Sequence, residues 1–539
     1  MKKGMKKSIS VMMVLVLALG LGGCGEKNGG SNGNSSSVKG PFDVYDPPVT
    51  ITTMMNEDNL AAAPTDYTLE DNPFIELYKE YGIHVEYALS GSASDLGTKL
   101  NMAITANKLP DIMMVSSAQF MELSEAGLLA DLTEIWDTFA SDEVKARYQT
   151  DGGVMMQNGY VDGKLYGLVS PAEYYDYIGM VAIRSDWMEE CGMKEPETME
   201  DLWRIAKTFK EKKMGGTCTI GIGMQKDVLN ILTPTVSLLN GYHAYTNVWL
   251  EKNGELINSN IQPEMKKALT ELSGKFSEGL IDPEFGSKDG TKVWEDALSG
   301  RSGIVMSDFC APFNTTNGAK NGQQWAYYAI PSCDGEMVRY QANVAFTGAL
   351  CVSANCKNPE ALVQMLNLFV KATNEDPELY SSNAVNNFAY PAIIYVANKN
   401  VGTHETYMKY LQDGQNPIVD TEGTEYLTTV ENAEKYRLNG DMDGFINWSV
   451  FGENGTEAII SEAVRNDAYL ISAYTGATTE KMAAYNPTLN TLTEQMITEI
   501  IMGTKKVEYF DEYVSAWKSN GGDEITKEIN EWYKSQESK

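Results

Sequence analysis

Apolar and polar positions alternate along the chain with two different periods, which predicts strands and helices in turn. Residues 49–55 (VTITTMM) and 83–87 (IHVEY) are predicted as strands, and 112–115 (IMMV) is predicted as a buried strand. Asp71-Asn72-Pro73 supplies a cap and a first-turn proline for a helix that ends near Gly82. A second helix is expected from Asp95 to Asn107. Strand-helix-strand repeats of this kind predict a parallel sheet with right-handed crossovers.

The same pattern returns later in the chain. Residues 179–184 (GMVAIR) read as a strand, and Thr198 with Asp201 forms a capping box for the helix that follows. Towards the C-terminus, apolar residues from Leu489 to Trp517 recur at helical intervals. The predicted architecture is therefore two α/β lobes with a helical C-terminal part.

The N-terminus has the pattern of a secretory signal. Four lysines precede an apolar stretch from Ile9 to Leu21, which is shorter than the about 20 residues that a membrane span needs. Leu21-Gly22-Gly23-Cys24 resembles the lipobox of bacterial lipoproteins, which predicts a signal peptide at 1–23 and a lipid on Cys24. Residues 25–40 are rich in Gly, Asn and Ser and are expected to form a flexible tether. The alternative is an ordinary signal peptide with an incidental cysteine.

Composition narrows the possible partners. The formal net charge is -31 and becomes more negative once the lysines of the signal are removed. Such an acidic surface repels phosphate backbones and anionic lipid headgroups, so we expect no nucleic-acid partner and a lipid rather than a basic patch as the anchor. The six cysteines after Cys24 match no zinc spacing and are interpreted as buried free thiols, although a disulfide between the closest pair, Cys351 and Cys356, stays open.

Several segments, in their order and spacing, resemble the family 1 extracellular solute-binding proteins, the lipoprotein receptors of sugar-importing ABC transporters in Gram-positive bacteria. They are LPDI (109–112), AGLLADLT (126–133), VDGKLYGL (161–168), IRSDWMEECGMKEPETMEDL (183–202), LSGRSGIVM (298–306) and the tail from 500 to 533. The similarity covers residues 48–539 and is greatest to the longer, oligosaccharide-binding members.

The resemblance implies an α/β, two-lobe fold of the periplasmic-binding-protein type II kind, each lobe a mixed sheet flanked by helices. After a tether at 24–47, the N-terminal lobe is expected to comprise 48–168 and 350–445, and the C-terminal lobe 172–343 and 452–539. Hinge crossovers are expected near 169–172, 343–349 and 445–452. The resemblance also implies that the protein, as a monomer on the extracellular face of the cell membrane, captures an oligosaccharide between its lobes. The implied partners are membrane permease subunits and, indirectly, ATPase subunits.

Candidate ligand-binding residues follow from sugar chemistry, since a cleft for sugars needs flat aromatic rings for the C–H faces and fixed polar groups for the hydroxyls. Candidates after predicted strands lie where open α/β sheets bind ligands. Others lie in loops that the resemblance places on the cleft. The predicted residues are Asn56, Glu57, Asp58, Ser117, Gln119, Tyr174, Tyr175, Tyr177, Asp308, Phe309, Asn447 and Trp448.

No cofactor or metal is expected. Relatives often carry a calcium loop after the helix that ends near Phe209, but residues 210–223 here have no acidic residue after Glu211. Asn439, Asp441 and Asp443 match part of an EF-hand loop, yet Val450 stands where the bidentate glutamate belongs. An Asx/Gly turn explains the same residues without an ion.

Two other functions compete with solute capture. The chain has no HExxH, G-x-S-x-G, P-loop or Rossmann motif, but its 74 acidic residues leave room for a glycosidase pair. A lipid-anchored glycoside hydrolase or lyase is therefore the first alternative, and a glycan-binding surface adhesin is the second. Solute binding without catalysis is the function we expect.

Overall fold

The computed structural model describes residues 38–62, 67–171, 175–229, 235–342, 346–375, 388–414, 424–476 and 478–537. The predicted signal peptide and Cys24 lie outside these residues. No helix in the described ranges is long and apolar enough to cross a membrane.

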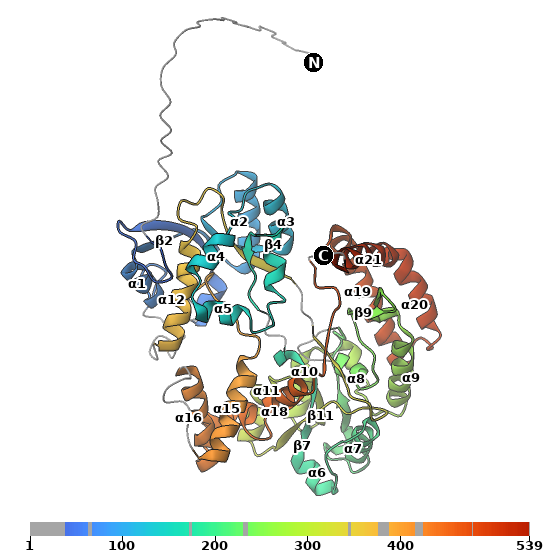
Figure 1. Ribbon diagram of the computed structural model, residues 1–539. Helices are drawn as coiled ribbons and strands as arrows, with labels where there is room; N and C mark the ends of the chain where they lie inside the picture. Colours follow the sequence, from blue (N-terminus) through green and yellow to red (C-terminus); the bar gives the residue numbers. More distant parts are fainter. Residues whose placement is uncertain are drawn as a thin grey trace, which may run out of the picture. The chain divides into compact units, whose positions relative to one another are not determined.

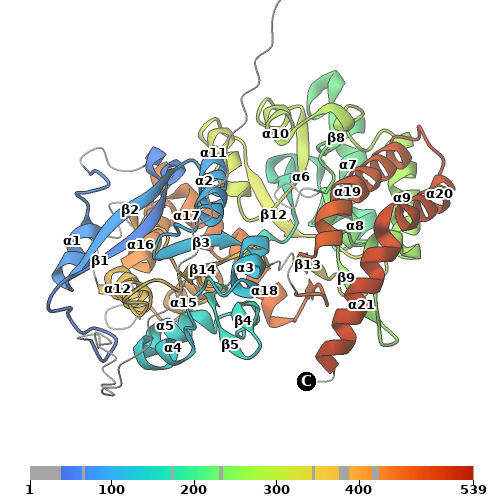
Figure 2. The ribbon, with the colours of Figure 1, turned by 90° about the horizontal axis from the view of Figure 1, so that it is seen from above.

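The first elements follow the sequence pattern closely. β1 (Val49–Asn56) pairs in parallel with β2 (Ile83–Gly91), as predicted, and α1 (Pro73–Glu80) connects them. Asn72 caps α1 by accepting hydrogen bonds from the backbone N–H groups of Phe74 and Ile75, both at 3.1 Å. In Figure 2, β1 and β2 lie side by side next to α1.

β3 (Ile112–Ser116) differs from the prediction of a parallel sheet. Its hydrogen-bonded neighbour is β14 (Gly348–Val352), which runs antiparallel to it and pairs on its other side with β6 (Gly167–Leu168). β3 contacts β1 through a side chain, since the Thr53 hydroxyl donates to the Ile112 carbonyl at 3.1 Å. This region therefore has a parallel pair, β1-β2, and a separate three-stranded antiparallel sheet, β3-β14-β6, rather than the one parallel sheet that was predicted.

A second sheet has the strand order β12-β7-β11-β8. Its strands are β12 (Trp325–Ala329), β7 (Met180–Arg184), β11 (Ser302–Ser307) and β8 (Ile220–Gly223). Every residue of β7, β8 and β11 is buried, which fits strands covered on both faces. A Cβ on Gly303 would lie 2.4 Å from the Trp187 ring, so only glycine allows this close packing.

Helices complete the two regions. Around the first sheet lie α2 (Ala93–Thr105), α3 (Ser117–Glu125), α4 (Thr133–Phe139), α5 (Asp142–Tyr148) and α12 (Ala361–Glu375). The helices in the region of the second sheet are α6 (Ser185–Cys191), α7 (Met199–Glu211), α8 (Thr235–Asn240), α9 (Pro263–Ser277), α10 (Gly290–Leu298) and α11 (Ala311–Lys320). The Thr198–Asp201 capping box starts α7 as predicted.

The later helices are α15 (Lys399–Asp413), α16 (Thr424–Asn439), α17 (Phe445–Phe451), α18 (Thr456–Arg465), α19 (Glu480–Ile501), α20 (Tyr509–Trp517) and α21 (Asp523–Glu537). The last three lie side by side in Figures 1 and 2 and form the helical tail that the sequence predicts. Short strands include β4 (Tyr160–Val161), β5 (Lys164–Leu165), β9 (Trp249–Lys252), β10 (Glu255–Asn258), β13 (Tyr340–Ala342) and β15 (Tyr469–Ile471).

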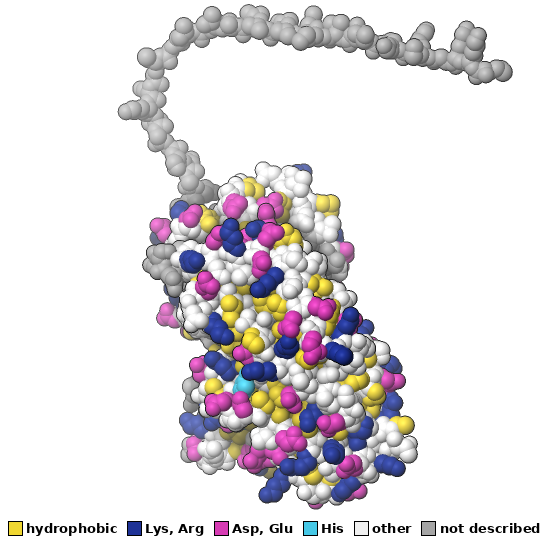
Figure 3. All heavy atoms as spheres, turned by 90° about the vertical axis from the view of Figure 1, so that its right-hand side faces the viewer, with side chains coloured by type: hydrophobic (Ala, Val, Ile, Leu, Met, Phe, Trp, Pro, Cys, Tyr) yellow, Lys and Arg dark blue, Asp and Glu magenta, His cyan; other side chains and the backbone are white. Residues whose placement is uncertain are grey.

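Within the described ranges, the buried apolar residues form two large clusters and one small one. The largest surrounds the β12-β7-β11-β8 sheet and reaches the C-terminal helices, and the second surrounds α12 and β14. The small cluster consists of Tyr407, Tyr426, Val430 and Ala433. On the face shown in Figure 3, acidic and basic side chains are interspersed, so this face offers no extended basic patch.

Candidate functional site

A cavity of about 630 Å³ opens at the carboxyl ends of β1 and β3. Asn56 is the last residue of β1 and Ser116 is the last residue of β3, and both line the cavity. The cavity is also lined by Met54, Leu96, Leu100, Met114, Gln119, Ser170, Tyr390 and Tyr395. Polar side chains therefore meet an apolar and aromatic wall, the combination expected of a small-molecule site.

The polar wall is held in place before any ligand arrives. Ser116 and Gln119 form a capping box at the start of α3. The Gln119 side-chain Oε1 accepts from the Ser116 backbone N–H at 2.9 Å, and its Nε2 donates to Asn101 Oδ1 at 2.7 Å. Both ends of the amide are thus fixed, and it joins α3 to α2.

The aromatic part of the wall comes from a distant segment. Tyr390 and Tyr395 belong to a stretch before α15, and the Tyr395 backbone N–H donates to Ser170 Oγ at 2.9 Å. Burial raises the pKa of the Tyr390 phenol to about 12, so it stays neutral at ordinary pH. The Tyr395 side chain is 49% exposed, so its ring can be covered by a ligand. Sequence reasoning missed both tyrosines, because no local pattern links them to β1 or β3.

The other residues predicted near this site do not line the cavity. Glu57 is exposed in the short 3-10 helix after β1. Asp58 Oδ2 accepts from the backbone N–H of Ala93 at 2.8 Å, which fixes the start of α2. Ser117 is buried at the start of α3, where its backbone N–H donates to the Thr347 carbonyl at 2.9 Å.

A second group of predicted residues meets beside α18. The Tyr469 hydroxyl donates to the Tyr175 carbonyl at 3.0 Å, and the two rings pack edge to face with centroids 4.8 Å apart. The Thr456 hydroxyl donates to the Phe309 carbonyl at 3.1 Å. Predicted residues 175 and 309, far apart in sequence, thus both contact the α18–β15 region. Tyr174 lies outside the described residues, and Tyr177 is described only in its backbone, within the 3-10 helix Tyr175–Tyr177.

The acidic side chains in this second group are buried. Asp308 is 1% exposed, and burial raises its pKa to about 6 despite the hydrogen bond from the Cys310 backbone N–H at 2.8 Å. Glu457, at the start of α18, is 0% exposed, and burial followed by the charge of Asp176 raises its pKa well above the ordinary range. Each of these two acids is too deeply buried to contact a substrate in this structure.

Asn447 and Trp448 lie in the short helix α17 rather than in a glycine-rich loop. The Trp448 ring packs edge to face on Tyr407 with centroids 6.4 Å apart, at the margin of the small apolar cluster. Trp448 also lines a separate cavity of about 490 Å³ together with Trp325 and Phe445. Asn447 is half-buried and lines none of the cavities described above.

The partial EF-hand pattern forms a turn. Asp441 Oδ1 accepts from the Asp443 backbone N–H at 3.0 Å, and the 3-10 helix Met442–Gly444 follows directly after it. This is the Asx turn that explains the residues without an ion. The six cysteines within the described ranges are free thiols, of which Cys351 is buried, whereas Cys218 and Cys333 are exposed and differ from the prediction of buried thiols.

Comparisons with known proteins agree with this architecture. Residues 75–374 match the family model described as bacterial extracellular solute-binding protein. Lipoprotein LipO of Bacillus subtilis is 21% identical over 485 residues, covering 86% of this chain and 88% of the relative. The polygalacturonan/rhamnogalacturonan-binding protein YtcQ of the same organism is 22% identical over 442 residues, covering 81% and 83%.

Among solved structures, an HMO-binding, ABC-transporter-associated solute-binding protein from Bifidobacterium longum infantis has the same fold. It aligns with a TM-score of 0.62 at 15% identity and covers 90% of this chain and 98% of its own. Since the family model matches more than half of the sequence, the chain belongs to the bacterial extracellular solute-binding proteins, and its role is solute binding for ABC transport rather than catalysis.

Proposed function

We propose that the protein captures an oligosaccharide and delivers it to the permease of an ABC importer. The observation that carries the proposal is the cavity at the ends of β1 and β3, which joins fixed hydrogen-bonding groups to aromatic rings. Sugars present hydroxyls and apolar C–H faces, and this wall has partners for both. The relative YtcQ is a polygalacturonan/rhamnogalacturonan-binding protein, which supports a carbohydrate ligand here.

In the proposed complex, Asn56, Ser116 and Gln119 bind ligand hydroxyls, and Tyr395 stacks on a sugar face. We also propose ligand contacts by three residues outside this cavity, which are Phe309, Tyr175 and Trp448. Ligand contacts from both lobes would favour the closed form, the usual hinge motion of two-lobed binding proteins.

The experiment is a calorimetric screen of the mature chain against neutral fructo-oligosaccharides, milk-type oligosaccharides and oligogalacturonates. We expect binding to one class, and Tyr395→Ala should weaken it about thirty-fold, since a central aromatic contact contributes about 2 kcal/mol. Exposed Tyr160, at 38%, lies in β4 outside the cavity, so Tyr160→Ala is the matched control and should bind as the wild type does. No binding to any soluble oligomer, with binding to insoluble glycan, would favour an adhesin instead.

Trp448→Ala tests the contact that lies outside the cavity. The ring is half-buried on Tyr407, so its removal should cost about 2 to 3 kcal/mol of unfolding free energy, less than a fully buried tryptophan. If Trp448 also stacks on the ligand, affinity falls about thirty-fold as well. A variant that binds as tightly as the wild type would remove Trp448 from the site.

We also propose that Cys24 is lipidated and anchors the protein on the outer face of the cell membrane. The lipobox-like sequence and the lipoprotein relative support this. Stable anchoring needs at least two acyl chains. Cys24→Ala should leave uncleaved precursor or release the protein into the medium, and absence of fatty-acid label from the wild-type protein would contradict the proposal.

A further inference from the structure

Two loops that are far apart in sequence bring together a histidine, a cysteine and an aspartate. His243 lies in the turn after α8, and Cys333 and Asp334 lie in the turn after β12. One ligand atom from each side chain lies within 4.8 Å of the other two. His243 Nε2 and Asp334 Oδ1 are already 3.0 Å apart in a hydrogen bond. Nothing in the proposed sugar site uses these residues.

The backbone holds the two loops together at this point. The Cys333 N–H donates to the Gly241 carbonyl at 3.0 Å. A Cβ on Gly241 would lie 2.9 Å from the Pro331 carbonyl oxygen, so glycine is required for so close an approach. A third segment joins them, because the Met199 N–H donates to the Ser332 carbonyl at 3.0 Å. The loops are therefore fixed by main-chain contacts that do not depend on the three side chains.

The side chains themselves are also oriented. The backbone of His243 is left-handed, with a φ of 58°, which is uncommon for residues other than glycine. Asp334 Oδ1 accepts from Ser332 Oγ at 2.9 Å and from the Glu336 N–H at 3.0 Å. Partners of this kind, which orient metal-binding side chains, strengthen metal sites.

We propose that His243, Cys333 and Asp334 bind a zinc-class transition ion. Imidazole nitrogen, thiolate and carboxylate are the ligands that Zn²⁺ takes in proteins, and three protein ligands leave a fourth position for water. Tetrahedral zinc separates its ligand atoms by roughly 3.3 to 3.8 Å, so the side chains need to move by about 1 Å or less. The Cys333 thiol is exposed, so an ion can reach it.

Binding requires two changes of proton position. The Cys333 thiol gives its proton to solvent and binds as the thiolate. His243 carries its remaining proton on Nδ1, so that Nε2 offers a lone pair to the ion in place of its hydrogen bond to Asp334. The bound ion would link the turn after α8 to the turn after β12 and so stabilise this part of the fold.

The test uses the mature full chain, reduced and stripped of metal, and titrates it with Co²⁺ and then with Zn²⁺. We expect one equivalent of Co²⁺ to produce a thiolate-to-cobalt charge-transfer band, which Zn²⁺ removes by competition. Cys333→Ser should abolish the band. His243→Asn, which tolerates the left-handed backbone, and Asp334→Asn should each weaken binding at least about tenfold.

Cys218→Ser is the matched control, because Cys218 is the other exposed thiol within the described residues and lies outside the cluster. It should leave the band and the affinity unchanged. Zn²⁺ should also raise the melting temperature of the wild type and of Cys218→Ser, but not that of Cys333→Ser. No charge-transfer band in the wild type, or a band that survives Cys333→Ser, would overturn the proposal, whereas oligosaccharide binding would be unaffected by either result.

Discussion

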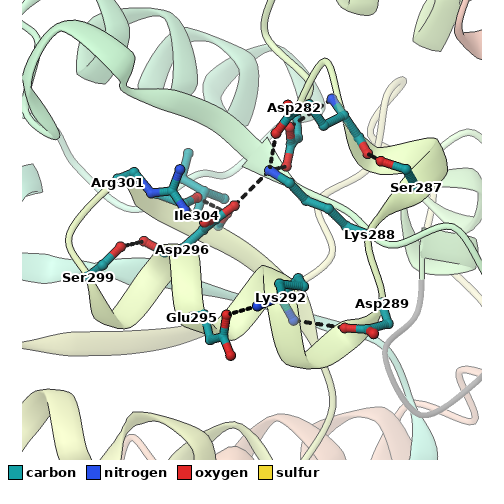
Figure 4. A network of polar contacts seen from close by, with 12 residues as sticks. Asp282, Ser287, Lys288, Asp289, Lys292, Glu295, Asp296, Ser299, Arg301 and Ile304 are labelled. Atoms are coloured by element: carbon teal, nitrogen blue, oxygen red, sulfur yellow. Dashed lines mark hydrogen bonds and ion pairs between the residues drawn. The ribbon is translucent and has the colours of Figure 1, made fainter.

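Two pairs of buried acids in this protein have opposite surroundings. Asp282 and Asp296 share the ammonium of Lys288, which lies 2.7 Å from each carboxylate. Figure 4 shows the lysine reaching between them, with Arg301 on the far side of Asp296. The second pair is Asp176 and Glu457, and the negative charge of Asp176 raises the pKa of Glu457. Asp176 Oδ2 accepts from Asn400 Nδ2 at 2.7 Å, whereas neither carboxylate oxygen of Glu457 has a hydrogen-bond partner among the described residues.

The difference shows how a protein accommodates a buried acid in two ways. Around Lys288 the ion pairs to the two acids, with their hydrogen bonds, offset the loss of hydration that burial costs. At Glu457 burial and the neighbouring charge of Asp176 raise the pKa, so the side chain avoids the cost by holding its proton. The first arrangement stabilises a loop within one sheet region, and the second lies beside Tyr469 and Tyr175, where proposed ligand contacts gather.

The largest expected effect comes from removing the shared cation. Lys288→Met leaves the Asp282 carboxylate, 2% exposed, without this ion pair, and leaves Asp296, 4% exposed, with only the exposed Arg301. We expect a loss of about 3 to 5 kcal/mol in the free energy of unfolding, measured by urea denaturation. The matched control is Lys292→Met, whose pair with Glu295 is exposed on both sides. It should leave the midpoint unchanged, and an equal loss in both variants would contradict the interpretation.

A smaller effect, an increase in the free energy of unfolding, is expected when Glu457 of the second pair is replaced. Glu457 has a raised pKa in the folded state, so the folded protein binds a proton more tightly than the unfolded chain does. Ionisation of Glu457 therefore does not lower the free energy of unfolding at a pH below the ordinary carboxyl pKa of about 4.3. As the pH rises above that value, ionisation lowers the free energy of unfolding increasingly. Glu457→Gln removes this titration.

We expect Glu457→Gln to be more stable than the wild type by on the order of 1 kcal/mol at pH 7, with no gain near pH 4. The measurement is the difference between the two melting temperatures over that range, which cancels the titration of groups elsewhere. Asp142→Asn is a suitable control, because this acid is exposed in the first turn of α5. A constant difference between Glu457→Gln and wild type across the pH range would mean that Glu457 does not titrate as proposed.

Only part of the fold and of the candidate site could be predicted from the sequence alone. Local signals were sufficient where partners are close in the chain, as for the Thr198–Asp201 capping box and the Asn72 cap of α1. Asn56 and Gln119 were predicted because they follow strands, and both line the cavity, whereas their role in ligand binding stays a prediction. The strand partner of β3 is β14, more than two hundred residues later, and no periodicity reports such a pairing.

The same limit applies to the sites. Tyr390 and Tyr395 reach the cavity from a segment with no recognisable pattern, and His243 meets Cys333 only because two loops fold together. Cysteine and histidine spacing along the chain matches no zinc motif, and the three residues of the proposed cluster come from two loops that are far apart in sequence. Trp448 was expected in a loop between glycines, but the segment closes into α17, where Tyr407 covers part of the ring.

The smallest expected effect distinguishes the two cations around Asp296. Arg301 also pairs with Asp296, but its side chain is 51% exposed, whereas that of Lys288 is 12% exposed. Solvent weakens the attraction of the exposed guanidinium, and Asp296 keeps Lys288 when Arg301 is removed. Arg301→Met should therefore cost less than about 1 kcal/mol of unfolding free energy, and most of that should disappear at about 1 M salt, where charges are screened over about 3 Å. The loss in Lys288→Met should persist at that salt concentration, because the pair that it breaks is buried. If Arg301→Met were as costly as Lys288→Met, the charge balance of the whole network, rather than the buried ammonium, would decide the stability of this region.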